Sequence, residues 1–307
     1  MLYDLIIIGL GPAGLTAGIY AARRNLKTLI IGKEFGGNMA KAHLIENYPG
    51  FESISGIELS KKMSGQASKF GCEIIYDSAV DLIKEKDSFK VICETNSFES
   101  KAVILATGTA HRELGIKGEK EFLGKGVSYC PTCDGPFFRN RIVAVIGGSD
   151  SALTSAAYLS TIAKKVYLIH RGEEFRGETK NLEKILQTQN IERIMNSVVS
   201  EIKGGKIVES IFVKNVKTEE IKEIKVDGVF IQVGYVPLSN LLKNLNVKTD
   251  EKGYIEVNKK METNVPGVFA AGDVTGGILQ VAQAVGQGAI AAISAYYYIK
   301  NMKNPYY

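Results

Sequence analysis

The sequence predicts an α/β protein built from two similar three-layer domains, the second inserted into the first. Three observations lead to this prediction: a long internal repeat, a glycine-rich turn after an apolar run in each copy, and two short strand-like segments that follow the copies. Where strands and helices alternate, the strands pair in parallel and helices cover the sheet. We therefore expect two parallel sheets in one chain.

The repeat joins residues 8–32 and 146–170, which align without a gap at an offset of 138 positions. The recurring pairs are Gly9 and Gly147, Leu15 and Leu153, Thr16 and Thr154, Tyr20 and Tyr158, Lys27 and Lys165, and Ile31 and Ile169. The chain therefore contains two β-α-β starts of one kind.

In the first copy, residues 4–8 are typical of a buried parallel strand, an Ala-rich stretch predicts a helix, and residues 28–31 predict the next strand. The turn “GLGPAG” is a G-x-G-x-x-G in the context that dinucleotide binding requires. Gly9 makes the turn, Gly11 lets a pyrophosphate approach the backbone, and Gly14 lets helix and strand pack closely. A glycine-rich turn in an ordinary α/β core is the alternative.

The second copy departs from this rule. Ser149 replaces the middle glycine and Ala152 the last. Alanine is common at the last position, but Ser149 puts a Cβ where the backbone should meet phosphate. A second, weaker nucleotide site is therefore predicted at Gly147, Gly148, Ser149 and Asp150.

Two later segments, residues 104–108 and 268–273, each predict a strand that ends in a turn of small residues. Asp273 then precedes a helical stretch at residues 279–298, where it can accept a hydrogen bond from a ribityl hydroxyl. Two Rossmann-like sites and this C-terminal return predict a first domain at 1–113 and 238–307, with an inserted domain at 114–237. We expect the chain to cross near 111–114 and 234–237.

Composition excludes several classes of protein. The 307 residues are 45% hydrophobic with a net charge of +5, and the lysines are spread along the chain. Nothing resembles a nucleic-acid motif, and no apolar run approaches the ~20 residues that span a bilayer. The first residues lack the basic region and cleavage site of a signal peptide. We expect a cytoplasmic protein that binds neither nucleic acid nor membrane.

Cys130 and Cys133 form a C-x-x-C that Asp134 follows directly. A disulfide staple across two residues closes almost no loop and stabilises little. A structural zinc site needs four ligands, whereas Cys72 and Cys93 are isolated. The histidines also lack ligand spacing; they are His43, His111 and His170. A redox-active thiol pair is the favoured interpretation, and no metal is expected.

Six motifs, taken in order, resemble the low-molecular-weight thioredoxin reductases, which are class II pyridine nucleotide-disulfide oxidoreductases. They are “GLGPAG”, “ENYPGF”, “ILATG”, “CPTCDGPFF”, “HRGEEFR” and “TNVPGVFAAGDVTGG”. The resemblance covers nearly the whole chain, and the C-x-x-C-D-G before the second repeat is its most specific element. It implies FAD on the first domain, a nicotinamide nucleotide on the second, a homodimer, and a thioredoxin or glutaredoxin-like partner.

Carried over residue by residue, the resemblance implies a set of FAD contacts. They are Gly9, Gly11, Gly14, Gly37, Asn38, Asn47, Thr107, Gly108, Gly272, Asp273, Gln280, Val281 and Ala282. The family usually has Gln where this chain has Asn38. An acid that binds the adenosine ribose would align with Gly32, so Glu34 is expected in that role.

The family places the flavin-facing thiol at the second cysteine, here Cys133. Cys130 is left to attack the target disulfide, and Cys133 resolves the mixed disulfide. Asp134 is the nearest candidate for moving protons; alternatively, it is a helix N-cap or turn residue.

The family binds the 2′-phosphate of NADPH through His-Arg-Arg and a later Arg. Here His170, Arg171 and Arg176 match this pattern, but Gly172 takes the place of the second Arg. Glu173 and Glu174 follow, and would repel a phosphate unless they point to solvent. We expect NADPH to be favoured over NADH by a small margin, with NADH possible.

Other functions stay open. The flavin could be reduced by ferredoxin or a deazaflavin, or the chain could be a dithiol oxidase that passes electrons to oxygen. “CPTCDGP” also resembles the reductase component of alkyl hydroperoxide reductase, although that protein carries an additional N-terminal disulfide-bearing domain. A flavin-binding sensor would have no need for a C-x-x-C.

Overall fold

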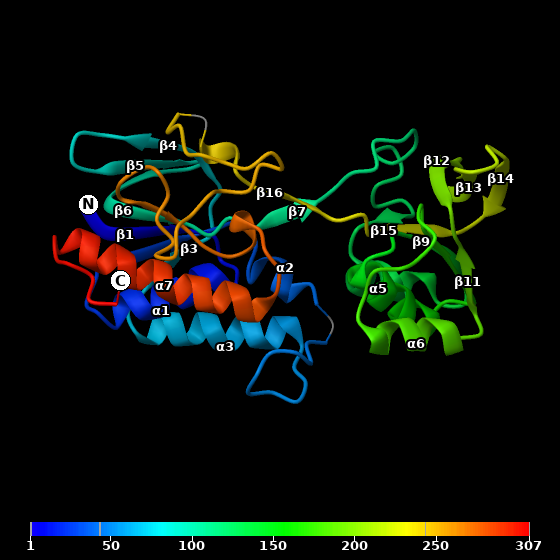
Figure 1. Cartoon of the computed structure of the whole chain (residues 1–307), viewed down its shortest axis with the longest axis horizontal. Helices are drawn as coiled ribbons and strands as arrows, with labels where there is room; N and C mark the ends of the chain where they lie inside the picture. The colour runs from blue at the N-terminus through cyan, green and yellow to red at the C-terminus, as the bar shows by residue number, and fades with distance from the viewer. Residues whose placement is uncertain (1, 43, 243, 307) are drawn as a thin grey trace. The chain divides into compact units, whose positions relative to one another are not determined.

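The structure, a computed structural model, describes residues 2–42, 44–242 and 244–306. The chain divides into two compact units (Figure 1). Unit 1 comprises Met1–Ala110 and Val236–Tyr307, and unit 2 comprises His111–Tyr235. Each unit contains a parallel sheet with helices, so the predicted α/β fold with two Rossmann-like domains is confirmed.

The sheet of unit 1 has the strand order β3-β2-β1-β6-β5-β4, and β17 also pairs with β6. Its strands are β1 (Leu2–Ile8), β2 (Thr28–Ile31), β3 (Glu73–Ile75), β4 (Ala79–Lys84), β5 (Phe89–Cys93), β6 (Ser97–Leu105) and β17 (Val268–Ala270). Strands β1, β2, β3, β6 and β17 pair in parallel, whereas β4 and β5 join antiparallel at one edge.

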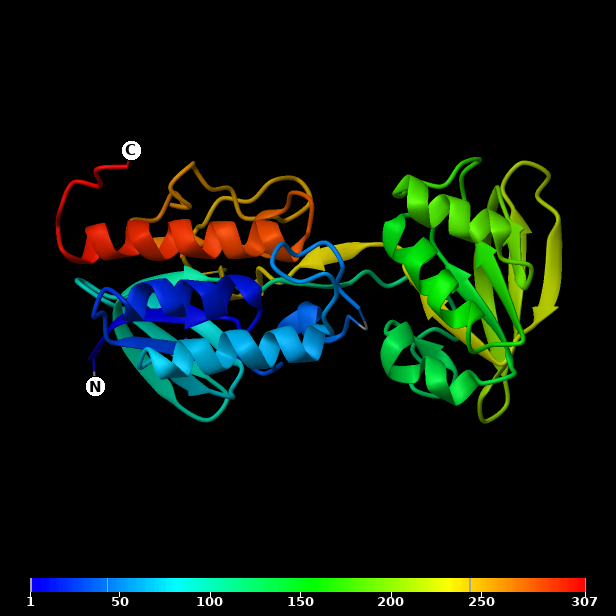
Figure 2. The same ribbon diagram turned by 90° about the horizontal axis from the view of Figure 1, so that it is seen from below.

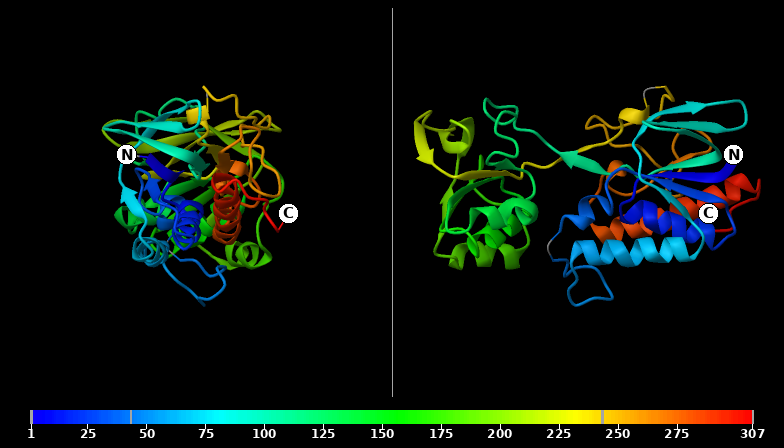
Figure 3. Two further views of the ribbon diagram at one scale, coloured as in Figure 1. Left: turned by 90° about the vertical axis from the view of Figure 1, so that its left-hand side faces the viewer. Right: turned by 180° about the vertical axis from the view of Figure 1, so that it is seen from behind.

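Three helices of unit 1 lie along one face of this sheet (Figure 2). They are α1 (Pro12–Ala22), α3 (Gly56–Lys69) and α7 (Val281–Ile299); the shorter elements are α2 (Gly37–Ala40), η2 (Asn240–Leu242) and η3 (Asp273–Thr275). Successive strand side chains point to opposite faces. Leu5 and Ile7 therefore pack beneath the helices, whereas Ile6 and Ile8 pack in a second cluster with Leu82. Both chain termini lie in unit 1 (Figure 3).

Unit 2 has a parallel sheet in the order β11-β10-β9-β15-β8 and a separate antiparallel sheet β12-β13-β14. Their strands are β8 (Val127–Ser128), β9 (Ile142–Ile146), β10 (Lys165–Ile169), β11 (Ile191–Ile194), β12 (Ser197–Gly204), β13 (Val208–Asn215), β14 (Ile221–Lys225) and β15 (Gly228–Ile231). The helices are α4 (Pro131–Asp134), η1 (Gly135–Phe138), α5 (Asp150–Ser160) and α6 (Thr179–Gln187). Val143 and Val145 of β9 pack with α5, whereas Ala144 and Ile146 pack with the antiparallel sheet.

The two copies of the repeat fold alike. Strands β1 and β9 end at Ile8 and Ile146, and α1 and α5 have 11 residues each. These helices begin and end 138 positions apart, as the aligned sequences require. The predicted correspondence of the two β-α-β copies is therefore seen in the structure.

The chain passes between the units through two paired strands, β7 (Thr109–His111) and β16 (Tyr235–Pro237). The Leu238 amide donates to the Gly108 carbonyl at 3.0 Å and extends this pairing. Within the described ranges, no helix has the length and apolar character needed to cross a membrane.

Candidate active site

The first glycine turn combines two glycines that packing requires with one that borders open space. A Cβ at Gly9, whose φ is +129°, would lie 1.9 Å from the Ala106 carbonyl oxygen, and one at Gly14 would lie 1.9 Å from the Gly9 oxygen. At Gly11 the nearest atom to a Cβ would be the Gly36 oxygen at 4.0 Å. Gly9 and Gly14 thus hold strand and helix together, and Gly11 leaves room for a ligand.

Other predicted FAD residues surround the start of α1. A Cβ at Gly37 would lie 3.4 Å from the Gly11 Cα, and one at Gly272 would lie 2.8 Å from the Ala13 Cβ. Gly108 has a φ of +71°, and a Cβ there would have no atom within 4 Å. The structure therefore brings Gly11, Gly37 and Gly272 together.

Asp273 is the first residue of η3, directly after Gly272. Burial raises the pKa of its carboxyl group above the usual value. Two glutamines of α7 hold the backbone on either side of Asp273. The Gln287 side chain accepts from the Gly272 amide at 2.8 Å, and Gln283 donates to the Gly276 carbonyl at 2.6 Å. Sequence reasoning missed both glutamines, although two amides four residues apart in a largely apolar helix are a usable signal.

Helix α7 begins at Val281, two residues later than the sequence suggested. Gln280 is its N-cap, and Val281 and Ala282 open its first turn. The Gln280 side-chain oxygen accepts a hydrogen bond from the Asn47 amide at 3.0 Å. The structure thus brings together two predicted FAD residues that are 233 positions apart.

Asn38 and Thr107 use their polar groups within unit 1. The Asn38 side-chain amide donates to the Thr109 carbonyl at 2.9 Å. The Thr107 hydroxyl donates to the Leu238 carbonyl at 2.7 Å. Each keeps an oxygen that could accept a hydrogen bond from a ligand.

The carboxylate of Glu34 is exposed and forms an ion pair with Lys41 at 2.6 Å. A Cβ at Gly32 would lie only 3.0 Å from Leu10, so the residue after β2 has little room for an acidic side chain. The role of Glu34 at a ribose stays a prediction.

The second glycine turn, at the end of β9, is also close-packed. Gly147 has a φ of +148°, and a Cβ there would lie 2.2 Å from the Gln232 oxygen. A Cβ at Gly148 would lie 2.1 Å from Nδ1 of His170. Ser149 is the exposed N-cap of α5. Asp150 accepts hydrogen bonds from the Glu178 amide and the Asn181 side chain, both at 2.9 Å.

The segment after β10 folds against this turn. The Arg176 amide donates to the Gly148 carbonyl at 2.7 Å, and both Arg171 and Arg176 are exposed. The His170 ring packs on Phe175 with centroids 5.5 Å apart. Desolvation, together with the nearby Arg171 and Arg176, lowers the pKa of His170, so the ring is neutral near pH 7. The Glu173 side chain is exposed and forms an ion pair with Lys217, and its effect on a phosphate stays a prediction.

The two cysteines of the C-x-x-C form a disulfide with Cα atoms 5.3 Å apart. Cys130 is the N-cap of α4, and its sulfur accepts from the Cys133 amide at 3.3 Å. Cys133 is exposed and Cys130 is half-buried. Asp134 ends α4, and its side chain makes no N-cap hydrogen bond to η1.

Cys72 and Cys93 are buried and free, in agreement with a role as small core residues. Burial raises the pKa of each thiol to about 11; for Cys93 the nearby Asp77 contributes as well. Among the described residues no cluster could hold a metal ion. His43, which the sequence analysis also excluded as a metal ligand, is not among the described residues.

These pKa values predict the labelling of the oxidised protein by iodoacetamide at pH 8. The thiolate is the reactive form, and about one in a thousand of these buried thiols is ionised at that pH. We expect almost no labelling before reduction and two labelled cysteines, Cys130 and Cys133, after it. Mass spectrometry measures this, and unfolding the reduced protein in guanidinium should allow all four cysteines to be labelled. Fast labelling of the native oxidised protein would contradict the expected burial.

A buried carboxylate connects the start of unit 2 with the redox segment. Glu119 is 1% exposed and accepts hydrogen bonds from the amides of Leu114 and Gly115 at 2.8 and 2.7 Å. It also accepts from the Tyr129 hydroxyl at 2.7 Å, and burial together with this bond raises the pKa of Tyr129. Tyr129 precedes Cys130. The sequence alone gives no signal that separates Glu119 from its exposed neighbours.

Glu119→Ala would leave these three donors unpaired in the interior. We expect the free energy of unfolding of unit 2 to fall by about 3 kcal/mol. Urea unfolding followed by tyrosine fluorescence measures it. The control is Glu113→Ala, which removes an exposed ion pair with Lys120 and should change stability by less than about 1 kcal/mol. Equal effects of the two substitutions would contradict the role given to Glu119.

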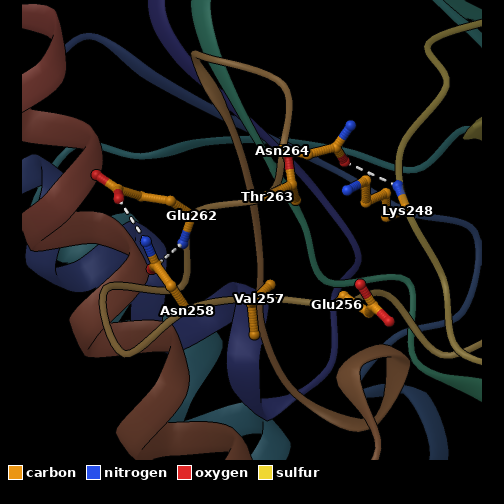
Figure 4. A pocket seen from close by; sticks show the side chains of 7 residues that line it. All are labelled: Lys248, Glu256, Val257, Asn258, Glu262, Thr263 and Asn264. Carbon is orange, nitrogen blue, oxygen red and sulfur yellow. Dashed lines mark hydrogen bonds between the residues drawn. The ribbon is translucent and has the colours of Figure 1, made fainter.

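A surface hollow of about 300 Å³ in unit 1 contains none of the predicted site residues (Figure 4). Some of its polar groups bond to one another: Asn258 donates to Glu262 at 2.7 Å, and Asn264 accepts from the Lys248 amide at 2.8 Å. These partnered groups give no indication of a ligand.

Residues 3–288 match the pyridine nucleotide-disulphide oxidoreductase family. The thioredoxin reductase of Bacillus subtilis (strain 168) is 43% identical over 306 residues, which cover 98% of this chain and 96% of that protein. The crystal structure of Lactococcus lactis thioredoxin reductase is 42% identical with a TM-score of 0.95, over 98% of this chain and 100% of that one. That of a ferredoxin-flavin thioredoxin reductase from Clostridium acetobutylicum is 33% identical with a TM-score of 0.54, over 98% and 99%.

Proposed function

Because the chain belongs to the pyridine nucleotide-disulphide oxidoreductase family, and within it to the thioredoxin reductases, we propose that it is a thioredoxin-disulfide reductase. Electrons pass from a nicotinamide nucleotide, through FAD and the Cys130–Cys133 pair, to thioredoxin or a related dithiol protein. The observation that carries this proposal is the disulfide in the unit that also contains the second glycine turn.

Unit 1 has the features that FAD requires. Gly11 and Gly108 border open space, so a pyrophosphate and a ring can approach the backbone there. The Asp273 carboxylate is desolvated, and no hydrogen bond to it is found from the described residues. It is therefore available to accept a hydrogen bond from a ribityl hydroxyl. When bound, FAD supplies the two-electron transfer from a nicotinamide to a disulfide.

The two cysteines carry out the exchange with the partner. In the reduced form, the Cys130 thiolate attacks one sulfur of the target disulfide and releases a target thiolate, which takes up a proton. Cys133 then attacks the Cys130 sulfur, releases the second target thiol and restores the Cys130–Cys133 bond. The Cys133 amide, which donates to the Cys130 sulfur, favours Cys130 as the thiolate. Asp134, at the end of α4, is the candidate for moving the protons.

NADPH is the favoured donor by a small margin. Arg171 and Arg176 are the two cations of the segment after β10, and the neutral His170 adds no charge. A missing charge-assisted contact at Gly172 weakens discrimination by an amount equal to about 1.5–3 kcal/mol, or roughly ten- to a hundredfold. The Michaelis constants for NADPH and NADH should both be high.

A second candidate is the same disulfide chemistry with a donor other than a nicotinamide. Ser149 in place of glycine and Gly172 in place of arginine both weaken the nucleotide site. The similar protein from Clostridium acetobutylicum is a ferredoxin-flavin thioredoxin reductase.

Anaerobic mixing decides between the two donors. We expect NADPH, and more weakly NADH, to bleach the flavin absorbance of the pure protein, with NADPH giving the higher kcat/KM. Reduced ferredoxin is the control donor. Bleaching by reduced ferredoxin but by neither nucleotide would establish the second candidate instead.

A cytoplasmic homodimer is part of the proposal and follows from the family resemblance. Sedimentation equilibrium of the FAD-loaded protein tests the dimer, which should have twice the mass of the 33.4 kDa chain.

A further inference from the structure

The segment that borders the second glycine turn carries opposing charges. Arg171 and Arg176 contribute two cations, and Glu173 and Glu174 contribute two anions. The Arg176 amide is fixed to the Gly148 carbonyl at 2.7 Å, so the segment lies at the turn itself. With its own charges cancelled, it has no net attraction for a phosphate.

Replacing Gly172 with a cationic residue would require the surrounding side chains to shift. A Cβ at Gly172 would lie 2.8 Å from Nε2 of His170. The same imidazole lies against Gly148, where a Cβ would come within 2.1 Å of Nδ1. The His170 ring therefore fills the space between the two glycines.

A cation reaches the segment from a different part of unit 2. Lys217 lies in the turn between β13 and β14, and its ammonium group pairs with the Glu173 carboxylate. This ion pair lowers the pKa of Glu173.

The backbone holds this turn in place. The Val216 amide donates to the Asn196 carbonyl at 2.7 Å, and the Asn196 amide donates to the Gly172 carbonyl at 3.0 Å. The Lys217 amide donates to the Asn215 side chain at 2.9 Å, which orders the turn. Lys217 is thus connected to the segment by a chain of backbone hydrogen bonds as well as by its charge.

We infer that Lys217 is a specificity-determining residue, which neutralises Glu173 and thereby lets the segment accept the 2′-phosphate of NADPH. The inference rests on the proposed function, in which this segment binds the adenosine ribose. Both side chains are more than half exposed, at 58% and 67%, so the pair stabilises the fold little. The ion pair affects ligand binding instead, because an uncompensated anion within about a Debye length of the site repels a doubly charged phosphate.

Calorimetric titration of the FAD-loaded protein with 2′,5′-ADP and with 5′-AMP tests the inference. We expect Lys217→Gln to weaken 2′,5′-ADP binding by about three- to tenfold and to leave 5′-AMP binding within about twofold. Lys222→Gln removes an exposed lysine from the same hairpin and should change the binding of both probes by less than about twofold.

The double variant Glu173→Gln/Lys217→Gln separates neutralisation from direct contact. If Lys217 acts by neutralising Glu173, 2′,5′-ADP binding recovers to within about twofold of the unaltered protein. Binding as weak as in Lys217→Gln would mean that the ammonium contacts the phosphate directly, and it would overturn the neutralisation. If Lys217→Gln leaves the ratio of the affinities for 2′,5′-ADP and 5′-AMP unchanged while NADPH still bleaches the flavin, the role of Lys217 is overturned and the proposed function stands. Absence of binding by both probes, with no bleaching by NADPH, would overturn the nicotinamide donor and this inference together.

Discussion

Replacing Cys133 with serine lowers the rate of disulfide reduction by at least about a thousandfold and leaves FAD bound. The redox pair exists only as two sulfurs, and one thiol cannot hold the electron pair that the partner disulfide accepts. The proposed FAD contacts all lie in unit 1, whereas both cysteines lie in unit 2, so the flavin absorbance should persist. Reduction of a thioredoxin disulfide, followed by thiol release, measures the loss.

Cys130→Ser should be equally inactive but distinguishable. It keeps Cys133, the thiol assigned to the flavin, and a thiolate next to oxidised flavin adds a long-wavelength absorbance band. Cys93→Ala is the control: this buried thiol has no part in the exchange, and activity should stay within about twofold. A long-wavelength band in Cys133→Ser rather than in Cys130→Ser would reverse the roles of the two cysteines.

Alanine at Gly9 and at Gly11 should have opposite consequences, although the residues are two positions apart. Gly9→Ala would place a methyl group 1.9 Å from the Ala106 oxygen at a φ of +129°, and we expect it to prevent stable folding of unit 1. Gly11→Ala meets no atom closer than 4.0 Å at a φ of −78°, so the stability of the FAD-free protein should change by less than about 1 kcal/mol.

The cost of Gly11→Ala should appear in FAD binding instead. The added methyl group occupies the space through which a pyrophosphate approaches the backbone, and we expect at least about tenfold weaker binding. Quenching of flavin fluorescence gives the affinity, and thermal unfolding gives the stability. Normal FAD binding by Gly11→Ala would show that the phosphates do not approach at Gly11.

The sequence was sufficient to predict the fold because its information is local and repeated. The spacing from Gly9 to Gly14 fixes a strand, a turn and a helix, and the aligned copy at Gly147 fixes them again. The redox pair was also predictable, because Cys130 and Cys133 are neighbours along the chain and need no distant segment to meet.

Contacts between distant segments could not be predicted in this way. Lys217 lies near Glu173 because backbone hydrogen bonds through Asn196 connect its hairpin turn to the segment. No sequence pattern distinguishes this lysine from the other lysines of the chain. The same holds for Glu119, whose three donors come from two separate segments. For this reason the sequence could not show that Glu173 has a cationic partner.

The insertion of unit 2 has a consequence for the order of events during synthesis. Strand β17 and helix α7 complete unit 1, yet the ribosome makes them only after the whole of unit 2 has been synthesised. At ~5–20 residues per second, the about 60 residues from the end of unit 2 to the end of α7 take roughly 3 to 13 seconds. During that interval the face of α1 that Gly288 later approaches, where a Cβ would lie 2.3 Å from the Ala13 oxygen, has no covering helix. The nascent chain therefore contains the complete sequence of one domain while the other still lacks its last elements, and the uncovered apolar surface belongs to the part that was translated first.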